Sequence, residues 1–117
     1  MAIVVRLGPL PLGRRRASRV AELERILATA VEVIEVIDVT RLASAIAVRE
    51  VAAVALDAPG PEDLADAITA AGPRPVLRPL WKQERNSRGE VDDVFDGYGL
   101  LTADGVERLA DGQLRAP

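Results

Sequence analysis

Three consecutive arginines, Arg14, Arg15 and Arg16, stand in a short connector of a chain that is acidic overall. The connector "RLGPLPLGRRRASRV" covers residues 6–20, while the 117-residue chain has a formal net charge of −3. Guanidinium groups bind phosphate oxygens in pairs, and a helix N-terminus adds unpaired N–H groups and partial positive charge. If a helix begins here, the connector predicts an anion site formed by Gly13, Arg14, Arg15, Arg16 and Ser18.

Further candidate anion-binding residues follow the later predicted strands. Ligands of open parallel sheets bind beyond the carboxyl ends of the strands, which adds Thr40, Arg41 and Arg78 to the predicted anion site. The opposing interpretation is that the arginines are solvated charges at the start of an amphipathic helix. In its favour, the sequence has no GxGxxG or GxxxxGK[ST] motif, and the two prolines of "GPLPLG" remove N–H donors.

Other chemistry has fewer candidate residues. The chain has no cysteine and no histidine, which removes thiolate nucleophiles, the commonest general base and the commonest transition-metal ligand. Asp38 and Asp57 end two predicted strands and could hold Mg²⁺ through water, but such acids more often cap a helix or pair with an arginine. We predict no metal and no cofactor.

The elements that must position these residues alternate along the chain. Segments rich in apolar residues at 2–7, 31–39, 51–58 and 74–81 predict strands, and apolar stripes at 16–30, 41–50 and 59–72 predict helices between them. This order predicts a single three-layer α/β domain, residues 1–117, with a mainly parallel Rossmann-like or flavodoxin-like sheet. The second strand should be central, and Pro75 and Pro79 should place the fourth at an edge or a bulge. A ferredoxin-like α+β fold is an alternative that fits the helix spacing less well.

Residues 78–101 predict a β-hairpin that turns at 86–89. With that centre, Arg85 faces Glu90 and Lys82 faces Asp93. The tail, 102–117, offers a helical turn at 106–110. Because a polar two-stranded ribbon is only marginally stable alone, we expect a second copy of the chain to brace it. The interface anchors would be Trp81, Phe95 and Tyr98; the alternative is that these rings complete a small core.

These observations predict a homodimeric, non-catalytic module that binds a phosphorylated small molecule or nucleotide at the carboxyl edge of the sheet. A metal-independent phosphodiesterase, acting on a nucleotide or cyclic oligonucleotide through an arginine and Ser18, is one alternative, and an assembly adaptor that works through the hairpin is another. In a dimer, the hairpin could carry cations over the ligand edge of the partner. The acidic balance argues against nucleic acid, and no apolar run suits a membrane. We expect a bacterial, cytoplasmic protein.

Overall fold

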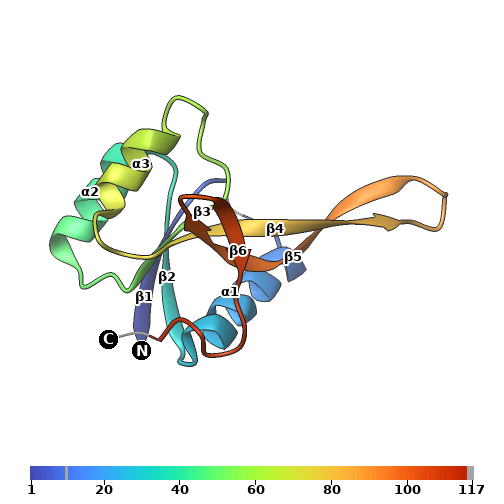
Figure 1. Ribbon diagram of the computed structural model, residues 1–117, viewed down its shortest axis with the longest axis horizontal. Coiled ribbons are helices and arrows are strands. Elements are labelled where there is room, and N and C mark those ends of the chain that lie inside the picture. Colours follow the sequence, from blue (N-terminus) through green and yellow to red (C-terminus); the bar gives the residue numbers. More distant parts are fainter. Residues whose placement is uncertain (10, 116–117) are drawn as a thin grey trace.

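The computed structural model describes residues 1–9 and 11–115 (Figure 1). Leu10 of the connector and residues 116–117 of the predicted tail lie outside this part. Within the described residues, helices and strands alternate as far as the fourth strand, after which two further strands follow. The elements are β1 (Ala2–Leu7), α1 (Arg14–Leu27), β2 (Val31–Val36), α2 (Val39–Val48), β3 (Ala53–Leu56), α3 (Leu64–Ala71), β4 (Val76–Arg85), β5 (Val91–Thr102) and β6 (Gly105–Arg108).

All the strands belong to one mixed sheet in the order β2-β1-β3-β4-β5-β6. β1 pairs in parallel with β2 and β3, and β3 pairs in parallel with only Val76 and Leu77 of β4. The β4–β5 and β5–β6 pairs are antiparallel. The prediction of a mainly parallel, Rossmann-like or flavodoxin-like sheet followed by a separate hairpin is therefore wrong. The hairpin strands are themselves strands of the sheet, and the predicted helical turn at 106–110 overlaps β6 instead.

Two strand positions also differ from the prediction. β2 is an edge strand, and β4 lies inside the sheet between β3 and β5. Pro79 is tolerated in an interior strand because it lies beyond the two β4 residues that pair with β3, next to a shift in the β4–β5 register. Local composition could not show whether β2 is an edge strand or a central strand. Its apolar side chains are covered by the helices on both faces of the sheet, and this packing does not require a second neighbouring strand.

Helices cover both faces of the sheet, as Figure 1 shows. α1 packs on one face through Leu23, Ile26 and Leu27, against apolar residues of β1, β3, β4 and β5. α2 and α3 pack on the other face, where Leu42 and the small side chains of Ala67 and Ala71 meet β1 and β3. The buried residues of each helix thus fall on its apolar stripe. Asp38 is the N-cap residue of α2, and its carboxylate accepts a hydrogen bond from the Arg41 N–H at 2.8 Å.

A β-bulge redirects β4 and β5 out of the sheet. The pairs Pro79–Tyr98 and Trp81–Phe95 leave two β5 residues opposite a single β4 residue. One of the two is Gly97, whose φ of +94° suits glycine and whose missing side chain leaves room for Glu22 of α1. Beyond the bulge, residues 81–95 form a two-stranded ribbon, which we call the arm. It extends along the 47 Å longest dimension of the molecule (Figure 1).

The tip of the arm turns at the predicted place but in a different register. Lys82 pairs with Val94 and Arg85 with Val91, one residue away from the predicted Lys82–Asp93 and Arg85–Glu90 pairs. The reason lies in Asn86, whose side-chain oxygen accepts hydrogen bonds from the N–H groups of both Arg88 and Glu90. This draws Glu90 into the turn and lengthens the loop by one residue.

Candidate functional site

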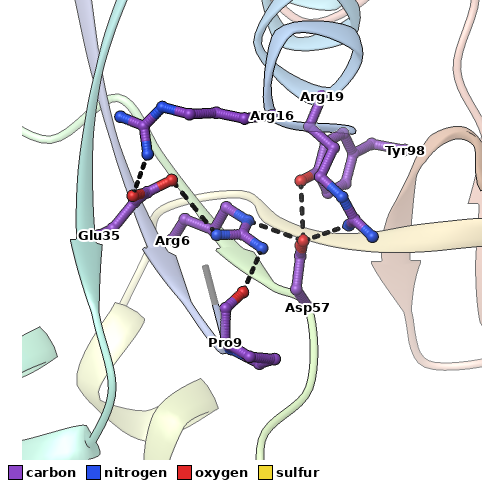
Figure 2. A network of polar contacts seen from close by, with 7 residues as sticks. All are labelled: Arg6, Pro9, Arg16, Arg19, Glu35, Asp57 and Tyr98. Atoms are coloured by element: carbon purple, nitrogen blue, oxygen red, sulfur yellow. Dashed lines mark hydrogen bonds and ion pairs between the residues drawn. The ribbon is translucent and has the colours of Figure 1, made fainter. Parts of the chain in front are cut away.

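A buried guanidinium lies at the carboxyl ends of the parallel strands. Arg6, near the end of β1, is only 2% exposed. Its Nε donates to Asp57 Oδ2 at 2.7 Å, its Nη2 to the Pro9 carbonyl at 2.7 Å, and its Nη1 to Glu35 Oε1 at 3.4 Å (Figure 2). The β1–β2 register places Glu35 directly beside Arg6, and Asp57 follows β3 on the other side. A buried charge is tolerated when it is paired and hydrogen-bonded in this way.

Asp57 is the centre of this network. Its Oδ2 accepts hydrogen bonds from Arg6, from Arg19 of α1 and, at 3.2 Å, from the Tyr98 hydroxyl (Figure 2). Burial raises the pKa of the Tyr98 phenol well above its ordinary value, and the negative charge of Asp57 raises it further. Tyr98 therefore remains a neutral donor over the physiological pH range. The network locks α1, β1, β3 and β5 together at one edge of the sheet.

A groove of about 530 Å³ lies next to this network, between the start of α1 and the base of the arm. α1 contributes basic and hydroxyl side chains, while the arm contributes two aromatic rings and two carboxylates. The lining residues are Arg14, Arg15, Ser18, Arg19, Trp81, Asp92, Asp93, Val94 and Phe95. The groove thus combines cations, acids and an aromatic wall in one concave surface.

Arg19 joins the groove to the buried network. Its guanidinium pairs with Asp57 and lies 4.6 Å from the Phe95 ring centroid and 5.4 Å from that of Trp81. Such stacking on aromatic faces is favourable for arginine and holds its planar group in one orientation. Two atoms are buried without a hydrogen-bond partner in the described structure: Nε of Arg19 and Oδ1 of Asp57. Arg19 is therefore a fixed cation in the floor of the groove.

The structure brings together only part of the predicted anion site. Arg14, Arg15 and Ser18 line the groove because residues three and four apart share one face of a helix. Arg16 turns toward β2 and pairs with Glu35 (Figure 2). Gly13 is the N-cap residue of α1, with a φ of +53°.

The other residues that were predicted to bind the anion lie outside the groove. Thr40 and Arg41 are in the first turn of α2. Arg78 neighbours Leu77, whose side chain faces α1, so the alternation of a strand puts Arg78 on the opposite face of the sheet. None of these three is among the described residues that line the groove. The prediction assumed that the ends of all the parallel strands contribute residues to one site. In the structure, the groove is instead formed by α1 and by residues of the arm on the same face of the sheet.

The three aromatic rings pack in a row along β4 and β5. Phe95 contacts Tyr98 edge-on at 5.2 Å and Trp81 at 6.1 Å between ring centroids. Tyr98 is 1% exposed and belongs to the core under α1, whereas Trp81 is 52% exposed. The row therefore runs from the core to the surface, and its outer ring is available to a ligand. Their assignment to a dimer interface stays a prediction.

The two acids considered as Mg²⁺ ligands perform more ordinary roles. Asp38 caps α2, and Asp57 pairs with two arginines, which confirms the alternative interpretation of both residues. The guanidinium groups around Asp57 also oppose the approach of a cation.

Arg6, Arg19 and Glu35 were not among the residues predicted for the site. One signal was present: an arginine inside the otherwise apolar run "AIVVRL" must find a buried carboxylate if the strand is central. Identifying the partner required the strand order, because Glu35 and Asp57 flank Arg6 only when β1 lies between β2 and β3.

A second hollow of about 760 Å³ lies at the opposite ends of the parallel strands, near Met1, Ala28 and Val51. Its basic residues include Arg74, whose guanidinium already donates to the carbonyls of Val51 and Ala71. The described residues that line this hollow include no aromatic ring, in contrast to those of the groove. We therefore place the candidate site in the groove between α1 and the arm.

Comparison with known proteins gives no further assignment: no family model, curated protein or solved structure matches the chain at a significant level. Within the described residues, every helix is too short or too polar to cross a membrane.

Proposed function

We propose that the protein binds a small phosphorylated ligand that carries an aromatic ring, such as a nucleotide, in the groove between α1 and the arm. The observation that carries this proposal is the convergence of Arg14, Arg15 and Arg19 with the half-exposed ring of Trp81 on one groove. Guanidinium groups suit phosphate oxygens, and an exposed indole provides a surface on which a base can stack.

The cations of the groove differ in their freedom. Arg16 and Arg19 are already held by carboxylates, while Arg14 and Arg15 have no ion pair among the described residues. A phosphate can therefore be bound by Arg14 and Arg15 without first breaking an internal ion pair. Ser18, one turn of helix away from both, can add a hydroxyl donor.

The acids of the groove favour a nucleotide over a simple anion. Asp92 and Asp93 line the groove together with the arginines and would repel a phosphate placed close to them. The same carboxylates can accept hydrogen bonds from hydroxyl or amino groups of a sugar or base. A ligand with phosphate at one end and donors at the other therefore fits the charge pattern.

Phosphodiester cleavage stays a second candidate because the groove does place Ser18 next to Arg14 and Arg15. Arginines could stabilise the developing charge without a metal, but the chain has no histidine to activate the hydroxyl. We therefore propose binding without catalysis, in the cytoplasm. Incubation with nucleotides and cyclic dinucleotides in EDTA tests for cleavage products, and fractionation of cells tests the location.

Binding can be measured with the protein's own tryptophan. Trp81 is the single tryptophan of the chain and lines the groove, so its fluorescence should change when ATP or a cyclic dinucleotide is titrated. We expect pyrophosphate to bind more weakly, because it cannot stack on the indole. The variant with Arg14→Glu and Arg15→Glu should bind at least about tenfold more weakly, from the loss of charged hydrogen bonds.

A matched control has the same change in net charge. Arg41→Glu with Arg88→Glu alters α2 and the tip of the arm, outside the residues that line the groove. It should leave the affinity nearly unchanged. Equal affinities of all three proteins would contradict the proposal, because the arginines of α1 would then play no part in binding.

A further inference from the structure

The outer half of β4 is complementary to a second copy of itself that runs in the antiparallel direction. Residues 81–85 read Trp-Lys-Gln-Glu-Arg, with a cation and an acid placed symmetrically on either side of Gln83. We propose that this strand pairs antiparallel with β4 of a second copy, about a twofold axis at Gln83, and that the protein is thereby a dimer. The proposal concerns an interaction surface and does not depend on the groove binding a ligand.

The edge of β4 that this pairing needs carries no neighbouring strand within residues 1–9 and 11–115. β3 pairs only with Val76 and Leu77, and β5 occupies the other edge of β4. From Arg78 to Arg85, the β3-side edge has no strand partner in the described part of the chain. Figure 1 shows the arm projecting away from the helices, so a second chain can approach it. A row of unpaired backbone groups on such an edge is a template for another strand.

The twofold register places opposite charges, and a cation and an aromatic ring, across from each other. With Gln83 opposite Gln83 of the second copy, each Lys82 faces a Glu84, and each Trp81 faces an Arg85. Within one chain, Lys82 and Glu84 share a face of β4 and form an ion pair at 3.1 Å while remaining 48% and 52% exposed. In the dimer, each can exchange this exposed partner for the opposite charge on the other strand. Opposite charges and cation–aromatic pairs on one face of an antiparallel ladder stabilise it.

Neighbouring registers are unfavourable. Moving the twofold axis to Lys82 places two lysines opposite each other, and moving it to Glu84 places two glutamates opposite each other. Like charges directly opposite each other destabilise a ladder. A lysine on an edge strand ordinarily prevents pairing with another strand. Here Glu84 of the second copy can neutralise Lys82, but only in the register centred on Gln83.

The other free edge of the arm does not offer the same complementarity. Along β5, Asp92 and Asp93 are adjacent acids, so a twofold axis at either residue places carboxylates opposite each other. One self-complementary edge gives an isologous contact that closes with two copies. The expected product is a dimer joined through a four-stranded arm, not a filament.

The same register affects the groove. Because Arg85 of the second copy lies opposite Trp81, and Trp81 lines the groove, each copy brings a guanidinium to the rim of its partner's groove. This consequence rests on the proposed ligand function, whereas the pairing itself does not.

Charge reversal tests the pairing. Lys82→Glu places two acids opposite each other at both cross-strand positions, and Glu84→Lys places two lysines there. Each variant should weaken dimerisation by about tenfold or more, as measured by sedimentation equilibrium against the 12.5 kDa chain mass. An equimolar mixture of the two variants restores both opposite-charge pairs and should form a heterodimer. Glu90→Lys and Arg88→Glu, in the turn of the same arm, are the matched controls and should dimerise like the original protein.

A cysteine at the twofold axis gives a second measurement. The chain has no cysteine, so Gln83→Cys introduces a single thiol. Opposite Cα atoms in an antiparallel pair lie about 4.5–5.5 Å apart, within the range of a disulfide. Mild oxidation should link this variant far more completely than Arg88→Cys.

The inference is overturned by a monomer at all concentrations, by a dimer that neither charge reversal affects, or by charge-reversed variants that fail to associate when mixed. Another protein captured on the arm in place of a second copy would count against it in the same way. Loss of dimerisation in Lys82→Glu with nucleotide binding retained would support the pairing and leave the proposed function intact.

Discussion

The buried network around Asp57 and the exposed arm both contain pairs of opposite charge, but the pairs differ in their access to water. At the edge of the parallel strands, Arg6 and Asp57 are withdrawn from water and depend on each other. On the arm, Lys82 and Glu84 are half-exposed and hydrated. Burial makes the first set necessary for folding and leaves the second set free to select a partner. Charge reversal should therefore unfold one region and change only the associations of the other.

The largest expected effect is from breaking the buried pair. Asp57→Ala leaves two guanidinium groups without their shared carboxylate, and removal of one partner of a buried pair costs about 3–5 kcal/mol. Urea unfolding followed by circular dichroism measures this change in the free energy of unfolding. A loss below about 1 kcal/mol would show that water reaches Arg6 and hydrates its guanidinium in place of the carboxylate.

Tyr98 allows a smaller disturbance of the same network. Tyr98→Phe removes the hydrogen bond to Asp57 and should lower the free energy of unfolding by about 1–2 kcal/mol. The two arginines still neutralise Asp57 in this variant, so the effect should be smaller than that of Asp57→Ala.

The raised pKa of Tyr98 also predicts a pH dependence with a definite sign. The unfolded phenol releases its proton near pH 10, while the folded one retains it. The contribution of Tyr98 to stability is therefore constant below pH 10 and decreases as the pH rises above that value. Because the chain has one tyrosine, phenolate absorbance should appear together with unfolding and not before it. Tyr98→Phe should have a weaker alkaline loss of stability, and an identical loss in both proteins would contradict this prediction.

Sequence patterns were sufficient for local structure but not for the arrangement of the sheet. The apolar stripes identified the helices, and the arginine triplet marked the start of α1, so Arg14, Arg15 and Ser18 were expected near a ligand. The path of β4 was not predictable, because its outer half is polar and resembles a separate hairpin.

The aromatic side of the groove followed from that path. Trp81 reaches the groove because the bulge at Gly97 turns the arm beside α1, and neither feature has a signal in local composition. The partners of Arg6 likewise depended on strand order. The pairing of strands that are distant in sequence, more than the residue types, determined which charged side chains line the groove.

The bulge connects the two regions, and Gly97 tests that connection. Its φ of +94° is unfavourable for alanine, and an added Cβ would lie 2.7 Å from Glu22 Oε1. Gly97→Ala should lower the free energy of unfolding by about 1–2 kcal/mol. It should also shift the fluorescence of Trp81, which lies just past the bulge. Gly89 has a similar positive φ at the turn, and no atom of the described residues lies within 4 Å of an added Cβ, so Gly89→Ala should destabilise the protein without altering Trp81 fluorescence.

The smallest effect belongs to the arm. Lys82→Ala removes ion pairs to Glu84 and Asp96 that are open to water, and such pairs contribute little to stability because solvent and salt screen them. Its unfolding should therefore be almost unchanged at protein concentrations where the chain is a monomer. At concentrations where the chain dimerises, the same variant should lose stability, because only the dimer places Lys82 opposite Glu84 of a second chain. A concentration-dependent difference between Lys82→Ala and the original protein, absent for Arg88→Ala, would show that these charges act between chains. A difference independent of concentration would show instead that Lys82 stabilises its own arm.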